Sequence, residues 1–348
     1  MRGEYKVSGG KLVAVDVDVE DDKLANVSIS GDFFLEPDTV IDDLNAALTG
    51  MPADASVADI AKAIEIAAGD AELIGFTPEV VGIAVRRALG KAVAWHDLTF
   101  DVIHHEPMNP AMHVALDQVL PESVAKGERE AALIIWEWDD PLVVIGSFQS
   151  YKNEIDQEAL ERHGMRVVRR VTGGGAMFME AGNCITYSLI VPTALVEGLS
   201  FEQSYAYLDE WVIAALKKVG VNATYVPLND IASDKGKIGG AAQKRFADGS
   251  MVHHVTMSYD IDADKMLDVL RIGREKLSDK GTKSAKKRVD PMRSQTGMAR
   301  EDIIASFLDT FNDRYNTRES DFTADEMRRA EELVESKFTA DEWTYKVP

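Results

Sequence analysis

The chain contains segments in which apolar residues recur at every second position and others in which they recur with helical spacing. LVAVDVDV at 12–19 alternates apolar and acidic residues, which predicts a half-buried strand, and DDKLANVSIS at 21–30 predicts a turn into a second strand. Helical spacing follows near 39–48, 57–68 and 78–90. Gly90 ends the third of these helices. Residues 1–95 are therefore predicted to form a small α+β domain.

A different pattern begins after Trp95, where continuous apolar runs and helices are mixed. ALIIWEW at 132–138 and LVVIG at 142–146 predict buried strands joined by a turn. Further strands are predicted for MRVV, NCITYSLIV, KIGGAAQKRF and SMVHHVTMSYD, and helices for 109–120, 154–163, 201–218, 298–313 and 323–336. Because strand pairs and helices do not alternate regularly, we expect an α+β domain with a mixed or antiparallel sheet over residues 96–348.

Composition narrows the class of protein. The 348 residues are 45% hydrophobic and 28% charged, as in folded globular proteins, and no apolar run reaches the roughly 18–20 residues that cross a bilayer. The N-terminus lacks the apolar core of a secretory signal. The formal charge of -21 argues against general affinity for nucleic acid or anionic lipid. A single cysteine, Cys184, cannot form an internal disulfide. We therefore expect a cytoplasmic protein without membrane or nucleic-acid binding.

The charge is unevenly distributed. Residues 1–95 hold 17 acids and 8 bases, whereas residues 271–293 hold 9 bases and 3 acids. The basic stretch is interpreted in two ways, as a solvated surface segment or as a cationic patch for an anionic ligand.

The first candidate for chemistry is the loop Arg169 to Phe178, with the sequence RRVTGGGAMF. Three consecutive glycines suit a sharp turn or a close approach of the backbone to a ligand. Successive backbone N–H groups can bind an anion, and two preceding arginines add positive charge suited to phosphate or carboxylate. The alternative is an ordinary tight turn with surface arginines. Neither the P-loop string nor G-x-G-x-x-G occurs here, because Phe178 takes the last position of the latter.

A second cluster combines Asn229-Asp230 with the segment Lys235 to Gly240, KGKIGG. A carboxylate near a glycine-flanked lysine could serve Mg²⁺ and phosphate. By itself the cluster is a weak signal, since Asn-Asp and Lys-Gly are common in turns.

Six segments, taken in order and spacing, resemble the catalytic domain of lipoate-protein ligases over about residues 96–348. They are NPAMHVALDQVL, WEWDDPLVVIGSFQ, RRVTGGGAMFMEAGN, NDIASDKGKIGGAAQKR, MVHHVTMSYDID and KLSDKGTKSAKKRV. The resemblance implies a fold shared with biotin ligases and octanoyltransferases and a two-step reaction. Lipoate and Mg-ATP give lipoyl-AMP, and the lipoyl group then passes to a lysine. The implied acceptors are lipoyl domains of 2-oxoacid dehydrogenase E2 subunits or the glycine-cleavage H protein.

The resemblance also implies roles for individual positions. Lys237 matches the catalytic lysine that touches adenylate and lipoyl carbonyl, and Asp230 matches the acid of the Mg²⁺ and phosphate neighbourhood. ATP or adenylate contacts are implied for Arg170, Gly175, Ala176, Met177, Phe178, Asp230 and Lys237. Lipoate contacts are implied for Arg169, Thr172, Gly174, Lys237, Gly239 and His254. Residues 276–288 match a loop that closes over adenylate. A fixed cation suits the first step, because attack of a carboxylate on a phosphate joins two anions.

Two features set this chain apart from the family pattern. Residues 1–95 resemble the accessory domain that usually follows the catalytic domain, and here they precede it. Met179-Glu180 stand where the family often has His-Asp, so the preference between lipoate, octanoate and another acid stays open.

The sequence leaves alternative reactions. Octanoyltransferases of related fold carry the acyl group on a cysteine without ATP, and Cys184 would be that residue, although a buried core position suits it better. A lipoate-binding protein without turnover and a ligase for biotin are further alternatives. His253-His254 and His104-His105 are not expected to chelate a metal, because neighbouring strand residues face opposite sides.

Overall fold

The structure is a computed structural model that describes residues 1–7, 10–90, 92–271 and 290–348. The chain divides into two compact units. Unit 1 comprises Met1–Asp97 and Ala194–Ser200, and unit 2 comprises Leu98–Thr193 and Phe201–Pro348. The segment Ala194–Ser200 joins unit 1 through a hydrogen bond from Val93 N to Ala194 O and an ion pair between Arg86 and Glu197. The sequence pattern did not predict this return of the chain.

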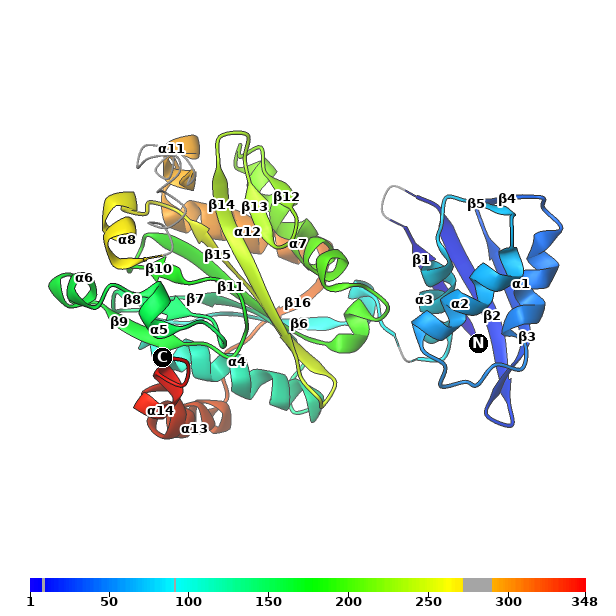
Figure 1. The fold of residues 1–348 in the computed structure, drawn as a ribbon, viewed down its shortest axis with the longest axis horizontal. Helices are drawn as coiled ribbons and strands as arrows, with labels where there is room; N and C mark the ends of the chain where they lie inside the picture. Colours follow the sequence, from blue (N-terminus) through cyan, green and yellow to red (C-terminus); the bar gives the residue numbers. More distant parts are fainter. Residues whose placement is uncertain (8–9, 91, 272–289) are drawn as a thin grey trace. The chain divides into compact units, whose positions relative to one another are not determined.

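Unit 1 is a three-stranded antiparallel sheet covered by helices (Figure 1). Its elements are β1 (Arg2–Lys6), β2 (Leu12–Glu20), β3 (Lys23–Gly31), β4 (Phe34–Glu36), α1 (Val40–Leu48), α2 (Val57–Ala68), β5 (Glu72–Ile74), α3 (Pro78–Ala88) and η1 (Trp95–Asp97). The alternation in β2 places Val13, Val15 and Val17 in the core. Ser56 begins α2 with a capping box that includes Asp59.

Unit 2 is built on an eight-stranded mixed sheet with the order β12-β13-β14-β15-β11-β7-β6-β16 (Figure 1). Its strands are β6 (Thr99–His104), β7 (Ala131–Trp136), β11 (Cys184–Pro192), β12 (Thr224–Val226), β13 (Asp230–Ala232), β14 (Lys237–Arg245), β15 (Ser250–Ser258) and β16 (Asn316–Glu319). Strand β6 runs parallel to both β7 and β16, and the other pairs are antiparallel. A smaller sheet orders β10 (Met177–Met179), β8 (Leu142–Ile145) and β9 (Arg166–Arg169).

Helices α4 (Pro110–Ala125) and α7 (Phe201–Lys218) cover opposite faces of the large sheet. The other described helices of residues 98–348 are α5 (Tyr151–Glu154), α6 (Gln157–Arg162), η2 (Thr193–Val196, mostly in unit 1), α8 (Ala263–Val269), α11 (Met292–Thr296), α12 (Arg300–Arg314), α13 (Ala324–Leu333), a π-helix η3 (Val334–Phe338) and α14 (Asp341–Thr344). Ser188 on β11 bonds to Asp117 of α4, whereas the adjacent Tyr187 bonds to Asp209 of α7. Because strand neighbours face opposite sides, α4 and α7 cover different faces.

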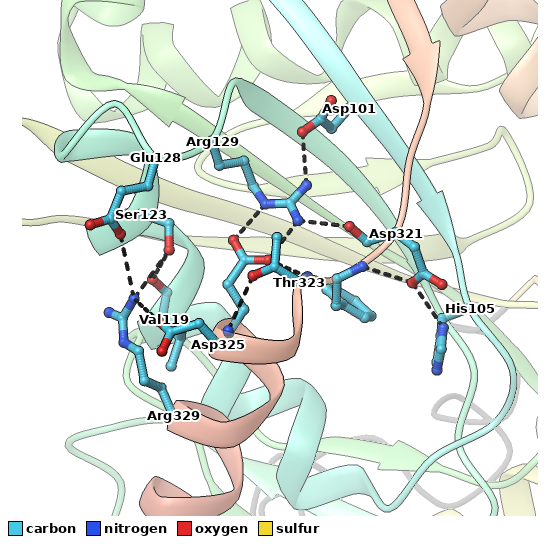
Figure 2. A network of polar contacts seen from close by, with 12 residues as sticks. Asp101, His105, Val119, Ser123, Glu128, Arg129, Asp321, Thr323, Asp325 and Arg329 are labelled. Atoms are coloured by element: carbon cyan, nitrogen blue, oxygen red, sulfur yellow. Dashed lines mark hydrogen bonds and ion pairs between the residues drawn. The ribbon is translucent and has the colours of Figure 1, made fainter.

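A buried ionic network fastens the C-terminal part of the chain to unit 2. Arg129 donates to Asp101 Oδ2 at 2.8 Å and to both carboxylate oxygens of Glu326 at 2.6 Å (Figure 2). Glu326 also accepts a hydrogen bond from Thr323 N and so caps α13. One guanidinium therefore links the start of β7, strand β6 and helix α13.

The predicted fold class is confirmed, and most predicted elements lie within a few residues of the observed ones. The single helix predicted at 154–163 is wrong in detail. Two short helices, α5 and α6, take its place, because Asp156 caps a new helix through Ala159 N. In the described part of the chain, no helix combines the length and apolar character required to cross a membrane.

Candidate functional site

The glycine-rich loop connects the end of β9 with β10 and passes close to the end of β8. Gly174 has φ of +91°, a conformation that favours glycine, and a Cβ on Gly146 would lie 2.3 Å from Gly174 O. A Cβ on Gly175 would meet nothing within 4 Å, so this side of the loop is open. The loop therefore needs glycine for its turn and presents bare backbone beside the cavities described next.

Two cavities lie beside this loop. The first, of about 90 Å³, has an apolar wall and a polar wall, and its lining includes Trp136, Val144, Arg170, Gly175, Ala176, Met177, Met179, Lys237, Gly240, Ala242, His254 and Thr256. The second, of about 180 Å³, is lined by residues that include Ala176, Met177, Phe178, Lys237, Gly239, Ser258, Met266 and Leu270. Ala176, Met177, Lys237 and Thr256 line both cavities.

Lys237 is the one cationic side chain of the described residues that lines both cavities. It begins β14, and its Nζ lies 2.7 Å from Asp230 Oδ1 at the start of the adjacent β13. The two side chains are 46% and 37% exposed, so their ion pair contributes little stability and exchanges readily with other partners. A Cβ on Gly240 would lie 3.1 Å from Lys237 Nζ, so glycine leaves room for the lysine head.

A chain of hydrogen bonds runs beneath the loop from a carboxylate to an arginine. Asp117 Oδ2 lies 2.7 Å from His254 Nδ1, and His254 Nε2 lies 2.8 Å from Thr172 Oγ1. Arg170 Nε donates to the same Thr172 oxygen at 2.8 Å. Burial lowers the pKa of His254, against the opposing effect of Asp117, so the ring is neutral. Its Nδ1–H then donates to Asp117 and its Nε2 accepts from Thr172.

Arg170 carries a buried charge, and none of the described carboxylates contacts it. Its remaining donors bond to the carbonyl oxygens of Val144, Gly173 and Gly175. Burial lowers the pKa of Arg170 to about 10, which leaves it protonated at neutral pH. The guanidinium thus fixes the loop and adds positive charge to the wall of the first cavity.

Arg169 lies elsewhere, and the structure does not support its predicted contact with lipoate. Its side chain is fully buried and donates to the carbonyl oxygens of Gly146, Gln149, Trp343 and Thr344. It lines neither cavity. Because successive residues of extended backbone face opposite sides, Arg169 at the end of β9 and the following Arg170 cannot both face the first cavity.

The other predicted site residues divide between the cavities and their supports. Gly175, Ala176 and Met177 line the first cavity, and Phe178 and Gly239 line only the second. Thr172 and Gly174 belong to the loop and line neither cavity, and Thr172 is a link in the hydrogen-bond chain. The predicted closing loop at 276–288 lies outside the described residues.

Three residues of the site escaped the sequence reasoning. Asp117 lies inside the quoted segment NPAMHVALDQVL, where its acidic side chain at a helical core position was the available signal. Trp136 lines the first cavity, and its Nε1 donates to Ser188 Oγ at 2.9 Å. Ser188 Oγ donates in turn to Asp117 Oδ1 at 2.7 Å. Asp117 therefore positions both a wall of the cavity and His254.

Cys184, His253 and His254 occupy buried positions in unit 2. Cys184 is fully buried in the core, and burial raises the pKa of its thiol to about 12. His253 and His254 face opposite sides and bond to Asp209 and Asp117 respectively. Across the described ranges, no group of three or more His, Cys, Asp or Glu side chains is arranged to hold a metal ion. Asp230 stands as a single carboxylate with one oxygen toward Lys237.

Comparison with known proteins places this site in a family. The model for the lipoyl protein ligase A/B catalytic domain matches residues 109–312. The octanoyltransferase LipM of Exiguobacterium sp. is 26% identical over an alignment of 276 positions, which covers 71% of this chain and 98% of that protein. The lipoate-protein ligase LplJ of Bacillus subtilis is 28% identical over 68% of this chain and 70% of its own length.

Solved structures agree on the fold. A bipartite lipoate protein ligase from Thermoplasma acidophilum, described together with its E2 lipoyl domain, superposes with a TM-score of 0.64 at 25% identity and covers 72% of this chain and 98% of that one. A lipoate-protein ligase A bound with ATP gives a TM-score of 0.61 at 22% identity, over 74% and 100% of the two chains. The named relatives include transferases and ligases, so they indicate a family and not one activity. This chain belongs to the lipoyl protein ligase A/B catalytic-domain family.

Proposed function

We propose that this protein is an ATP-dependent lipoate-protein ligase that forms lipoyl-AMP and transfers the lipoyl group to a protein lysine. The observation that carries the proposal is the position of Lys237, whose side chain lines two adjacent cavities. Lipoyl-AMP consists of an acyl chain and an adenylate joined at a phosphate. Two neighbouring cavities can hold these two parts, and a cation between the cavities can contact the phosphate that joins them.

The two cavities suit the two parts of such an intermediate. The first has Trp136, Val144 and Met179 on its apolar wall, which suit an acyl chain. The second is bounded by Phe178, Met266 and Leu270, which suit a flat adenine ring. Met179 lines the acyl cavity where the family often has histidine, so an apolar contact replaces a polar one there. The acid preference accordingly rests on hydrophobic contacts.

In the first step an oxygen of the lipoate carboxylate attacks the α-phosphorus of ATP, and the bond from that phosphorus to the bridging oxygen of pyrophosphate breaks. Lys237 contacts both anions from its place between the cavities and stabilises the charge that grows as they combine. Arg170 holds the loop through its hydrogen bonds to Gly173 O and Gly175 O and adds positive charge to the wall of the first cavity. In the second step the acceptor amine attacks the lipoyl carbonyl, AMP leaves, and the amine loses a proton to form the amide.

Asp230 fits Mg²⁺ in this scheme, because the ion is usually held by one or two carboxylates together with substrate phosphates. When bound there, the ion would neutralise phosphate charge. Lys237 Nζ already lies 2.7 Å from Asp230 Oδ1, so the carboxylate also directs the lysine to the junction of the cavities.

The same proposal extends to the partners and to unit 1. Acceptors would be lipoyl domains of 2-oxoacid dehydrogenase E2 subunits or the glycine-cleavage H protein. Residues 1–95 would be the accessory domain of the ligase, placed before the catalytic domain of residues 96–348.

The test is to incubate the protein with Mg-ATP and lipoate and to measure pyrophosphate and lipoyl-AMP. We expect Lys237→Ala to reduce their formation by about a hundredfold or more, the effect of losing a charge aimed at the reacting atoms. Lys235→Ala is the matched control, since Lys235 is exposed two residues away and lines neither cavity. Normal product formation by Lys237→Ala would contradict the assigned role.

An octanoyltransferase reaction is the second candidate, because close relatives carry that name. It needs a thiolate to accept the acyl group, and the chain has one cysteine, Cys184. That thiol is fully buried with its pKa raised to about 12, which disfavours this route. Mass spectrometry for an acyl thioester on Cys184, formed from an octanoyl thioester donor without ATP, separates the two reactions. Cys184→Ser that keeps full ATP-dependent activity would exclude the cysteine route.

A further inference from the structure

Two lysines of unit 2 lie over one tryptophan near the C-terminal end of the chain, and a third, Lys244 of β14, is their electrostatic neighbour. Lys337 Nζ lies 4.1 Å and Lys346 Nζ 3.7 Å from the centre of the Trp343 ring. Burial lowers the pKa of Lys337 to about 8, and Lys244 and Lys346 lower it further by repulsion. Within the described ranges none of these three ammonium groups forms an ion pair with a carboxylate. The chain as a whole carries a net charge of -21, so these ammonium groups form a local positive surface on an acidic protein.

The cluster has an exposed apolar neighbour. Phe148 is 82% exposed, which is unusual for an aromatic side chain, and Lys346 Nζ lies 5.8 Å from the centre of its ring. Surfaces that bind other proteins often combine an exposed aromatic side chain with charged residues at its border. We name Phe148, Lys244, Lys337 and Lys346 the lysine patch.

The lysine patch is joined to the catalytic loop by direct hydrogen bonds. Trp343 Nε1 donates to Arg169 O at 2.7 Å, and Lys346 Nζ donates to Ser147 Oγ at 3.0 Å. Ser147 N donates to Thr172 O in the glycine-rich loop. Along β14, Lys244 stands two positions after Ala242, which lines the first cavity, so the two residues share a face of the sheet. The patch therefore borders the site and lies outside the lining of both cavities.

We propose that the lysine patch is the docking surface for the acceptor, a small protein domain with acidic residues beside the lysine that becomes modified. The inference rests on the proposed function for the identity of the partner. A small substrate is not the occupant, because the patch lies outside both cavities. An acidic domain would otherwise be repelled by this protein, so a local positive surface beside the site is needed to hold it. Phe148 supplies an apolar anchor among the charges.

Direct binding tests the docking surface without any need for ATP or turnover. The probe is an apo lipoyl domain with acidic residues beside its acceptor lysine, which is itself replaced by arginine. We expect Lys244→Glu and Lys346→Glu each to weaken binding about tenfold, and Phe148→Ala to weaken it by a similar factor. Lys217→Glu is the matched control, because Lys217 is exposed at the end of α7 in the same unit, and we expect a change below about twofold. Thermal melting verifies that each variant is folded.

A charge swap makes the test specific to contact. Replacing an acidic residue of the lipoyl domain with lysine should restore binding to Lys346→Glu and weaken binding to the unchanged protein. Equal losses for Lys217→Glu and the patch variants would overturn the proposal, since net charge alone would then explain them. Binding of a poly-thymidine oligonucleotide through the same lysines, with no binding of the lipoyl domain, would also overturn it. Loss of pyrophosphate release with docking intact would refute only the proposed function.

Discussion

Arg129 and Arg170 are both buried in unit 2, and different groups neutralise them. Arg129 contacts the carboxylates of Asp101 and Glu326, which outweigh the effect of burial and raise its pKa. Arg170 contacts a hydroxyl and three backbone carbonyls, and burial lowers its pKa to about 10. Carboxylates therefore neutralise the charge of Arg129, whereas the groups that bond to Arg170 are all neutral.

This difference separates a structural charge from a functional one. The Arg129 network is closed, since its positive and negative groups satisfy one another away from the cavities (Figure 2). Arg170 reaches the nearest carboxylate of its network, Asp117, only through Thr172 and His254. A buried cation with neutral neighbours costs free energy, and an anionic ligand in the adjoining cavity would recover part of that cost. Distance to a counterion thus indicates which arginine serves the site.

The same substitution at both arginines should have its largest effect on stability at Arg129. Arg129→Gln leaves Glu326 as an unpaired buried carboxylate, while Asp101 keeps Arg318 as a partner. We expect the free energy of unfolding to fall by about 3 kcal/mol, the lower part of the range for breaking a buried ion pair. Urea denaturation measures it, and the remaining folded protein should form adenylate at nearly the normal rate. If Arg129→Gln lost adenylate formation but kept its free energy of unfolding, Arg129 would not be the structural arginine that the comparison requires.

At Arg170 the order of effects should be reversed. Arg170→Gln leaves only neutral acceptors behind, so we expect a stability loss of about 1–2 kcal/mol. If the proposed reaction is right, adenylate formation should fall by about a hundredfold, because the loop loses a positive charge from the wall of the first cavity. Initial rates of pyrophosphate release and urea denaturation, measured on Arg129→Gln and Arg170→Gln in parallel, give both numbers. Equal ratios of activity loss to stability loss would show that the two arginines do not differ in kind.

The sequence predicted the fold class and the site region, and it could not distinguish the arginines. Arg169 and Arg170 are adjacent and chemically identical, so only the direction of β9 decides which faces the cavity. Lys237 and Ala176 were both predicted to contact adenylate from their places in the ordered segments; they line the same two cavities, and the contact itself stays a prediction. The support of His254 by Asp117 joins residues 137 positions apart, and its geometry depends on the sheet register. Likewise, the clustering of Lys244 with Lys337 and Lys346 depends on the packing of the C-terminal helices.

The two regions should also lose stability in different pH ranges. Burial lowers the pKa of His254 below its usual 6.5, so the unfolded chain takes up a proton first as pH falls. The free energy of unfolding should therefore decrease from about pH 6.5 downward, by about 1.4 kcal/mol for each unit of pKa difference. His113 acts in the same sense, with its pKa lowered to about 4 by burial.

For Glu326 burial acts to raise the pKa, and the bonds from Arg129 and Thr323 outweigh it, so the pKa falls below its usual 4.5. The stability that this carboxylate contributes is present above pH 4.5 and is lost only as pH falls further. The free energy of unfolding is measured by urea denaturation from about pH 3.5 to 7.5, which spans both pKa shifts. In His254→Gln its decrease below about pH 6.5 should become smaller. It should not disappear, because His113 still contributes to it. Arg129→Gln should remove the loss of stability below about pH 4.5, because burial then raises the pKa of Glu326 without opposition from Arg129. If the free energy of unfolding varied with pH in the same way in the unchanged protein and in His254→Gln, burial would not lower the pKa of His254 as proposed.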